Sequence, residues 1–242
     1  MFYRSLTALE QAHIVEAFTF ELGKCLEQAI KERELQVLAN VDAGLCAKVA
    51  AGLGLPAPEG SPAENVTPSP ALSQIVTEPG PITGRKIGVI ADAGADLAGI
   101  DKLRKAAVKL GATVLVIAPA GGVLSHGGHQ ETADRTLLTA RSVEFDAIVV
   151  AGGTTPVPDI KLIVLLQEAF RHCKVMGAWG DGTVILQAAG ITADQAGVVT
   201  ASGATSAFTG QLAAAAGLHR VWERAPDVME SAVPPVPPAP RG

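Results

Sequence analysis

A proline-rich stretch over residues 56–84 is the feature that most constrains the fold of this chain. It contains seven prolines among Ser, Gly, Glu and Thr residues. Proline lacks the backbone N–H group that helices and central strands require, so the stretch favours an extended, semi-stiff linker. We therefore expect two folded parts, over residues 1–55 and 85–227. A second proline-rich segment, 228–242, is interpreted as an extended tail, with a PxxP ligand as the alternative.

The first folded part is predicted to begin with an amphipathic helix. Thr7 and Glu10 have the spacing of a capping box, in which both side chains satisfy N–H groups at a helix start near residue 8. Apolar residues then recur at helical spacing, and such a stripe needs a partner surface. The stripe consists of Val15, Phe18, Leu22 and Leu26.

Two further helices are expected in this part. One is predicted over residues 30–39, and Asp42 can cap another that ends at Gly52 or Gly54. Three short helices in about 55 residues bury too little surface to form a convincing independent domain. We expect them to pack on a surface outside this chain; the alternatives are the second folded part or another subunit.

The second part alternates short apolar runs with helical patterns. Apolar residues make up 48% of the chain but aromatic residues only 4%, so the core must be built mainly from Ala, Val, Ile and Leu. The fold class is α/β: a flavodoxin-like three-layer sandwich with a mostly parallel sheet. The predicted strands are 86–91, 113–118, 146–150, 175–178 and 198–200; the predicted helices are 96–110, 160–172, 183–189 and 206–216; and 121–141 is a polar hairpin or loop.

Charge and cysteine content exclude several classes of function. The net charge is −5 and no basic run compensates for it, so a nucleic-acid partner is not expected. Cys25, Cys46 and Cys173 have no metal-ligand spacing and suit a reducing compartment. No apolar run approaches the ~20 residues that span a bilayer, and Arg4 and Glu10 stand where a secretory signal is apolar. We expect a cytoplasmic protein without a membrane partner.

Any chemistry is expected beyond the carboxyl ends of the strands, where open α/β sheets bind ligands. The most distinctive segment there is 175–183, VMGAWGDGT, which has the pattern of a strand, a tight glycine turn and a helix start. Such a turn often lifts a Ser or Cys nucleophile to the helix N-terminus. The loops at this edge are 92–96, 119–122, 151–156 and 179–183.

This turn resembles the elbow of the intracellular-protease and deglycase superfamily, whose fold is shared with class I glutamine amidotransferases. In that superfamily a Cys stands where this chain has Gly180. The superfamily also usually has an acidic partner after the first strand; the matching position here is near Asp92 or Ala93, and no Glu is present there. Asp181 is expected to cap the next helix and complement its dipole. Cys173 should lie at the opposite end of the strand. The sequence therefore predicts no catalytic residue.

Other polar candidates are assigned structural roles. Gly121-Gly122 and Gly152-Gly153 lack phosphate-loop spacing and predict turns with positive φ. No metal site and no cofactor-binding residue is predicted, because a three-residue His spacing in a Gly-rich loop is not a zinc pattern. The residues considered were His126, His129 and Glu131 as metal ligands; His13 on a polar helix face; His172 as an imidazolium at a helix C-terminus; and Tyr3, Trp179 and Trp222 as core or interface anchors.

Nearly the entire chain resembles large-subunit catalases. Residues 2–22 and 40–55 are similar to the helical region that follows the haem domain, and the remainder is similar to the C-terminal domain found only in large-subunit catalases. The resemblance in the latter part is carried by SPALS at 69–73, GRKI at 84–87, FDAIVV at 145–150 and AGLHRVW at 216–222. The Gly-Asp-Gly elbow without cysteine also resembles that family.

The resemblance implies a parent enzyme that disproportionates hydrogen peroxide in oxidative-stress defence, with haem held by a proximal Tyr beside a distal His and Asn. Those motifs lie upstream of this chain, and Tyr3, the only tyrosine, is outside the haem-ligating motif. The implied role is a non-catalytic stabilising or assembly domain whose partners are the haem domain or other subunits of a homotetramer. The alternatives are a free-standing chaperone-like or ligand-binding module, or a degenerate deglycase or hydrolase.

Overall fold

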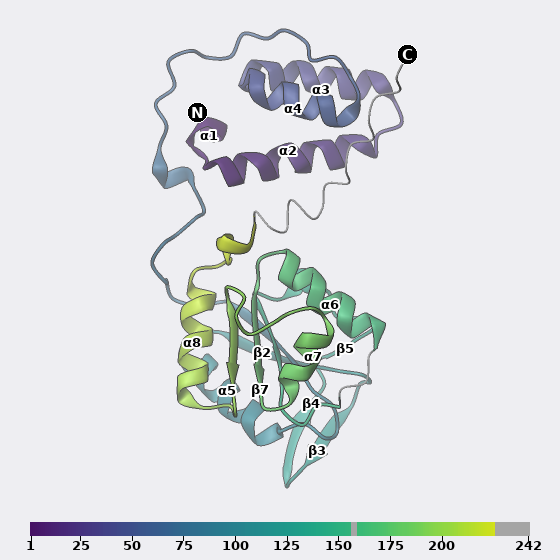
Figure 1. Cartoon of the computed structure of the whole chain (residues 1–242), viewed down its shortest axis with the longest axis vertical. Coiled ribbons are helices and arrows are strands. Elements are labelled where there is room, and N and C mark those ends of the chain that lie inside the picture. Colours follow the sequence, from purple (N-terminus) through teal and green to yellow (C-terminus); the bar gives the residue numbers. More distant parts are fainter. Residues whose placement is uncertain (156–158, 226–242) are drawn as a thin grey trace. The chain divides into compact units, whose positions relative to one another are not determined.

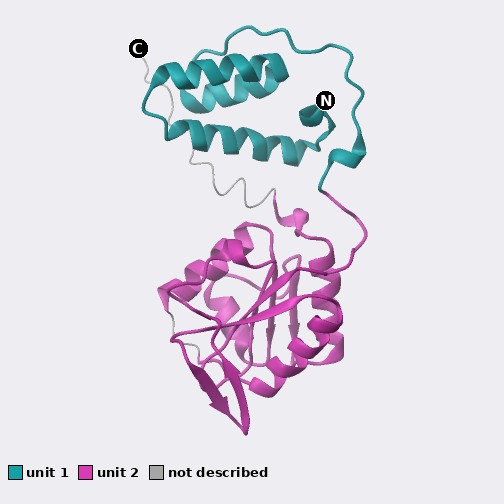
Figure 2. Cartoon of the chain, turned by 180° about the vertical axis from the view of Figure 1, so that it is seen from behind, with its two compact units in different colours: residues 1–74 teal, residues 75–242 magenta. Residues whose placement is uncertain are grey.

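The chain divides into two compact units, residues 1–74 and 75–242 (Figures 1 and 2). The computed structural model describes residues 1–155 and 159–225. The proline-rich tail expected over residues 228–242 lies outside the described residues. The boundary between the units falls inside the proline-rich stretch 56–84, whereas the four-part division made from the sequence stays a prediction.

Unit 1 contains the three expected helices. The capping box is confirmed: the Thr7 side chain accepts from the Glu10 N–H, and Glu10 reaches back to the Thr7 N–H at 2.9 Å. Asp42 caps the third helix through the Leu45 N–H, and that helix ends at Gly54 in the left-handed conformation. The elements are α1 (Phe2–Ser5), α2 (Ala8–Gly23), α3 (Gln28–Val41), α4 (Ala43–Leu53) and the 3-10 turn η1 (Pro70–Leu72).

These helices bury an apolar cluster of their own. Its central side chains come mainly from α3 and α4, and Val15 and Phe18 of α2 pack against it. The position of Leu26 was predicted wrongly: its side chain is 96% exposed, because α2 ends at Gly23 and Leu26 lies in the connection to α3. The cluster consists of Tyr3, Leu22, Leu35, Leu38, Ala39, Leu45, Cys46, Val49 and Ala50.

Much of the proline-rich stretch is fastened to unit 1. Glu10, which is 8% exposed, accepts hydrogen bonds from the Gln74 N–H at 2.6 Å and the Ser73 hydroxyl at 2.9 Å. Burial alone raises the pKa of this carboxyl, but these bonds and those from Thr7 outweigh it, so its pKa lies below the ordinary value. The Ala63 carbonyl accepts from Arg4 at 2.8 Å. The segment that precedes Ile75 is therefore held by side chains of the helices.

Unit 2 is built on a six-stranded sheet in the order β5-β2-β1-β6-β7-β8, in which every pairing is parallel. This confirms the α/β class. The strands are β1 (Lys86–Ile90), β2 (Thr113–Ala118), β5 (Arg135–Thr136), β6 (Ala147–Val150), β7 (Val175–Trp179) and β8 (Val198–Ala201). The helices are α5 (Leu97–Lys109), α6 (Ile160–Arg171), α7 (Gly182–Ala188) and α8 (Ser206–Gly217), with 3-10 turns η2 (Ser142–Glu144) and η3 (Trp222–Arg224).

Helices cover both faces of this sheet, so the unit is a three-layer sandwich of the flavodoxin-like kind (Figure 1). Alternate strand residues point to opposite faces. Ile87 and Val149 join the cluster that includes α5 and α8, whereas Ile90 and Val150 join the cluster that includes α6 and α7. The central strands are buried on both sides, as continuous apolar runs in parallel sheets require.

The polar excursion over residues 121–141 is a hairpin followed by a short edge strand. β3 (Val123–His126) and β4 (His129–Thr132) pair antiparallel, and two residues of β5 then join the main sheet beside β2. Arg104 of α5 anchors the hairpin through a 2.6 Å bond to Glu131 and also donates to the Val114 carbonyl. The hairpin is thereby connected to the second strand of the sheet.

Candidate functional site

The elbow predicted after the strand at 175–178 is present. β7 ends at Trp179, Gly180 adopts φ 58°, and α7 begins at Gly182. A side chain at position 180 would make only ordinary contacts, the nearest being 3.6 Å from the Gly152 Cα. The elbow therefore has space for a nucleophile, but Gly180 supplies none.

Asp181 does not cap α7, so that prediction is wrong. Its side chain makes no cap bond; instead Oδ1 accepts from the Gly153 N–H of the neighbouring loop at 2.5 Å. Gly153 adopts φ 75°, and a Cβ there would lie 2.4 Å from the Gly94 carbonyl oxygen. Only glycine fits such a position. Asp181 thus connects the elbow to the loop after β6.

The acidic side chains after β1 also connect neighbouring segments at this edge. Asp92 accepts from the N–H groups of Gly94 and Thr155 at 2.9 and 2.8 Å. Asp96 caps α5 through the Gly99 N–H at 2.9 Å and accepts from the buried Trp179 indole at 3.1 Å. These carboxylates hold the three loops of the carboxyl edge together, Asp92 and Asp181 by accepting from the backbone of the loop after β6 and Asp96 by accepting from the Trp179 indole. None of them stands beside a nucleophile or a base in the described bonds.

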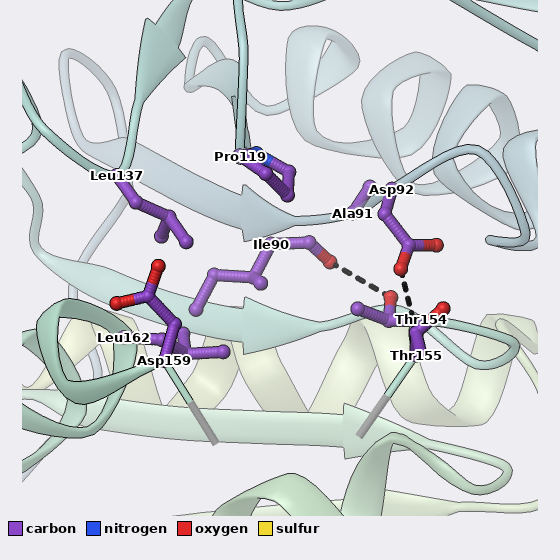
Figure 3. A pocket seen from close by; sticks show the side chains of 9 residues that line it. All are labelled: Ile90, Ala91, Asp92, Pro119, Leu137, Thr154, Thr155, Asp159 and Leu162. Carbon is purple, nitrogen blue, oxygen red and sulfur yellow. Dashed lines mark hydrogen bonds between the residues drawn. The ribbon is translucent and has the colours of Figure 1, made fainter. Parts of the chain in front are cut away.

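A cavity of about 260 Å³ opens beside this closed elbow. Its residues come from the ends of β1, β2 and β6, from the segment after β5 and from the start of α6 (Figure 3). The lining is Ile90, Ala91, Asp92, Pro119, Leu137, Thr154, Thr155, Asp159 and Leu162. Neither Gly180 nor Asp181 belongs to it, so the cavity is separate from the elbow.

The sequence located this cavity only in part. The strand-end rule selected the loops that supply Asp92, Pro119, Thr154 and Thr155. It missed Leu137, Asp159 and Leu162, because no local pattern brings the segment after β5 against the first turn of α6. The pairing of β5 with β2 does so across the fold.

Cys173 lies at the opposite, amino edge of the sheet, as predicted. It directly precedes Lys174 and β7, is 4% exposed, and accepts at its carbonyl from the Val221 N–H at 2.7 Å. Burial raises the pKa of its thiol, although Arg224 and Arg220 act in the other direction. A thiol in this state is a poor nucleophile.

Two buried cations neighbour this cysteine. Lys174 donates to the carbonyls of Ser142 and Phe145, and Arg224 donates to the Lys174 carbonyl while its guanidinium stacks 4.1 Å from the Phe170 ring. Burial lowers the pKa of Lys174 to about 8 and that of Arg224 to about 10. These cations fasten backbone carbonyls at the amino edge.

His172 differs from its predicted state. It follows α6, but burial lowers its pKa, and Arg171 and Lys174 lower it further. Burial and the neighbouring cations thus disfavour the imidazolium that the helix C-terminus was expected to stabilise mildly.

The histidines of the hairpin form a cross-strand pair. His126 lies opposite His129, and the Nδ1 of His126 is 3.1 Å from the Ala93 carbonyl oxygen. Glu131 bonds to Arg104, as described above. Within residues 1–155 and 159–225, no group of three or more His, Cys, Asp or Glu side chains could hold a metal ion. Of the two glycine pairs, Gly122 and Gly153 have the positive φ expected of turns, at 112° and 75°.

The aromatic residues considered from the sequence are structural in two cases. Tyr3 is 7% exposed in the core of unit 1, and Trp179 is 1% exposed, with its ring edge-on to Phe208 at 5.7 Å between ring centres. Trp222 is half-buried.

Comparison with known proteins identifies the family. Residues 83–226 match the family of the C-terminal domain found in long catalases. The chain belongs to that family. Residues 1–53 match a second family, described as catalase-related immune-responsive. The long-catalase C-terminal domain therefore occupies the three-layer sandwich of unit 2, and the second match covers α1 to α4.

Similar proteins include "Catalase HPII" of Mycobacterium avium, 38% identical over 95% of this chain and 35% of that protein. "Catalase HPII" of Pseudomonas aeruginosa is 36% identical over 93% of the chain and 32% of its own length. "Catalase-2" of Bacillus subtilis is 34% identical over 93% and 33%. The chain thus corresponds to the C-terminal portion of a large catalase and spans about a third of the length of these relatives.

Tyr3, the tyrosine of this chain, does not fit the role of a haem ligand. Tyr3 is enclosed by apolar side chains of unit 1, and this burial, with a smaller contribution from Asp42, raises the pKa of its phenol. A tyrosinate ligand is disfavoured in that setting.

Among the helices that the structure describes, none is long and apolar enough to cross a bilayer.

Proposed function

We propose that this chain is a non-catalytic stabilising and assembly region of a large-subunit, haem-containing catalase in the cytoplasm. The observation that carries the proposal is the elbow, where Gly180 replaces a nucleophile while Asp92, Asp96 and Asp181 are engaged by backbone or indole N–H groups. A site whose polar groups are all used to hold loops has a structural role. The similarity to large catalases supports the identity of the parent enzyme.

The partner in this proposal is the haem domain or another subunit of a homotetramer. Large apolar side chains on three helices of unit 1 are exposed, and the proposal places the partner surface there. Phe20 of α2 is 66% exposed, Val37 of α3 is 52% exposed, and Phe2 of α1 is 56% exposed. The haem domain is proposed to cover them.

An assembly experiment tests this proposal. A large catalase truncated before the region that matches residue 1 is co-expressed with the 242-residue chain. We expect the two to co-purify and the peroxide-decomposing activity to survive heating several-fold longer than without the chain. Phe20→Asp should abolish both effects, whereas Val108→Asp, at a 58% exposed position of α5, should retain them. Unchanged heat inactivation in the presence of the chain would contradict the stabilising role.

The exposed apolar residues also favour a second candidate, a chaperone-like role in which the chain holds unfolded proteins. Suppression of light scattering by an aggregating client at equimolar chain would support this role. Loss of that suppression in Phe20→Asp would assign it to unit 1. Absence of suppression by the unaltered chain would remove this candidate and leave the assembly role untouched.

A further inference from the structure

We infer that the cavity beside β1 binds a small organic cation, a primary ammonium group carried on a compact hydrocarbon body. This inference concerns a ligand site and is independent of the proposed assembly role. It rests on the chemistry of the nine lining residues and on the size of the cavity.

Among the described residues, the lining contains acidic and hydroxyl groups but no basic side chain. Asp159 supplies the carboxylate for a ligand, because both oxygens of Asp92 already accept from the N–H groups of Gly94 and Thr155. Thr154 and Thr155 supply hydroxyls. In Figure 3 the Asp159 carboxylate points toward Leu137. Carboxylates at a partly apolar surface favour an ammonium ligand, because charge-assisted hydrogen bonds are about twice as strong as neutral ones.

Anionic ligands are disfavoured by the backbone as well as by charge. Sites for phosphate at this edge of α/β sheets rely on unoccupied N–H groups of the loops and helix starts. Here the N–H groups of Gly94 and Thr155 donate to Asp92, and the Lys161 N–H at the start of α6 donates to Asp159. These three N–H groups, which could otherwise hold a nucleotide phosphate, are already engaged by protein carboxylates.

The remaining lining selects the hydrocarbon body. Ile90, Pro119, Leu137 and Leu162 are apolar, and both Leu137 and Leu162 are less than 10% exposed. Thr154 is 5% exposed and its hydroxyl donates to the Ile90 carbonyl at a long 3.4 Å. A cavity of about 260 Å³ exceeds the roughly 150 Å³ that holds benzene in an engineered protein and is smaller than most drug-sized pockets. A single ring with one ammonium group fits this range.

Benzylamine is the probe, titrated calorimetrically into the complete 242-residue chain at neutral pH. A ligand of this size is expected to bind with a Kd on the order of 1 mM. Benzyl alcohol, which has nearly the same shape and no charge, should bind at least about tenfold more weakly, and benzoate should not bind. Failure of benzylamine to bind at ~20 mM, or equal binding by benzyl alcohol, overturns the inference.

The Asp159→Asn variant tests whether the Asp159 carboxylate binds the ammonium group. Asparagine is as good a helix N-cap as aspartate, so α6 should remain folded while the charge is removed. Benzylamine affinity should fall about tenfold, and benzyl alcohol affinity should change by less than about twofold. Asp101→Asn, which removes an exposed carboxylate of α5 that pairs with Lys105, should leave both affinities unchanged. Unchanged benzylamine affinity in Asp159→Asn overturns the assignment.

Leu162→Trp tests the hydrocarbon part by filling the cavity, and it should abolish binding of both amine and alcohol. Its folding is checked by circular dichroism. If this variant does not fold, the Asp159→Asn result alone decides the inference.

Discussion

The two edges of the parallel sheet hold their polar groups in opposite ways. At the carboxyl edge, Asp92 and Asp181 accept hydrogen bonds from loop N–H groups, and Asp96 accepts from the first turn of α5 and from the Trp179 indole. At the amino edge, Lys174 and Arg224 donate to backbone carbonyls. Helices of this topology begin at the first edge, where N–H groups are unpaired, and end near the second, where carbonyls are unpaired. The distribution of charge therefore follows from the direction of the strands.

Asp96→Ala should break the carboxyl edge and has the largest expected effect. The variant loses the cap of α5, worth about 1 kcal/mol, and leaves the Trp179 indole N–H buried without its acceptor, at a further 1–3 kcal/mol. We expect the free energy of unfolding in urea to fall by about 3 kcal/mol. Asp101→Ala, on the same helix, should lower it by less than about 0.5 kcal/mol. Equal effects of the two substitutions would contradict the role given to Asp96.

Lys174→Met tests the amino edge through its pH dependence. The pKa of Lys174 is about 8 in the folded protein, below the ordinary value of 10.5. Between these two pH values the unfolded chain binds more protons at this residue, so its contribution to stability increases as pH rises. The stability difference between the unaltered chain and Lys174→Met should therefore shift by roughly 2 kcal/mol in favour of the unaltered chain from pH 8 to 10.

The matched control for this titration is Lys105→Met, which removes an exposed lysine of α5 paired with Asp101. Its stability difference from the unaltered chain should be flat over the same pH range. A flat profile for Lys174→Met as well would mean that the folded and unfolded states bind this proton equally.

Gly180→Cys tests the carboxyl edge and has the smallest expected effect on stability. The position accommodates a Cβ, and the strained φ of 58° is expected to cost about 1 kcal/mol. The new thiol should react with a disulfide reagent, yet ester hydrolysis should stay at the level of the unaltered chain, because no described base adjoins it. Measurable turnover by Gly180→Cys would revive the hydrolase alternative.

Local signals in the sequence were sufficient for most of the helices and strands. The runs at 113–118 and 206–216 contain β-branched residues or capped helical spacing, and the structure places elements there with nearly the same bounds. β5, only two residues long, has no pattern that distinguishes it from a loop. Leu26 was misplaced because its spacing continues the helical stripe although the helix has already ended.

The site was less predictable than the fold, since its contacts join distant residues. The absence of a nucleophile at the elbow could be predicted, because the resemblance places a Cys at the single position that Gly180 occupies here. The bond of Asp181 to Gly153 spans 28 residues, and that of Asp92 to Thr155 spans 63. A carboxylate at a helix start usually accepts from an N–H group of the same helix. Only the folded structure reveals that Asp181 accepts from Gly153 of the neighbouring loop instead.

The positions of the aromatic residues give each edge of the sheet its own fluorophore. The chain has two tryptophans and one tyrosine. Trp179 ends β7 at the carboxyl edge, and Trp222 follows Val221, which is bonded to Cys173 at the amino edge. Unit 1 contributes Tyr3 but no tryptophan. The fluorescence of single-tryptophan variants would therefore report the loosening of one edge at a time. Fluorescence excited at a wavelength that tryptophan absorbs and tyrosine does not would report the unfolding of unit 2 without any signal from unit 1.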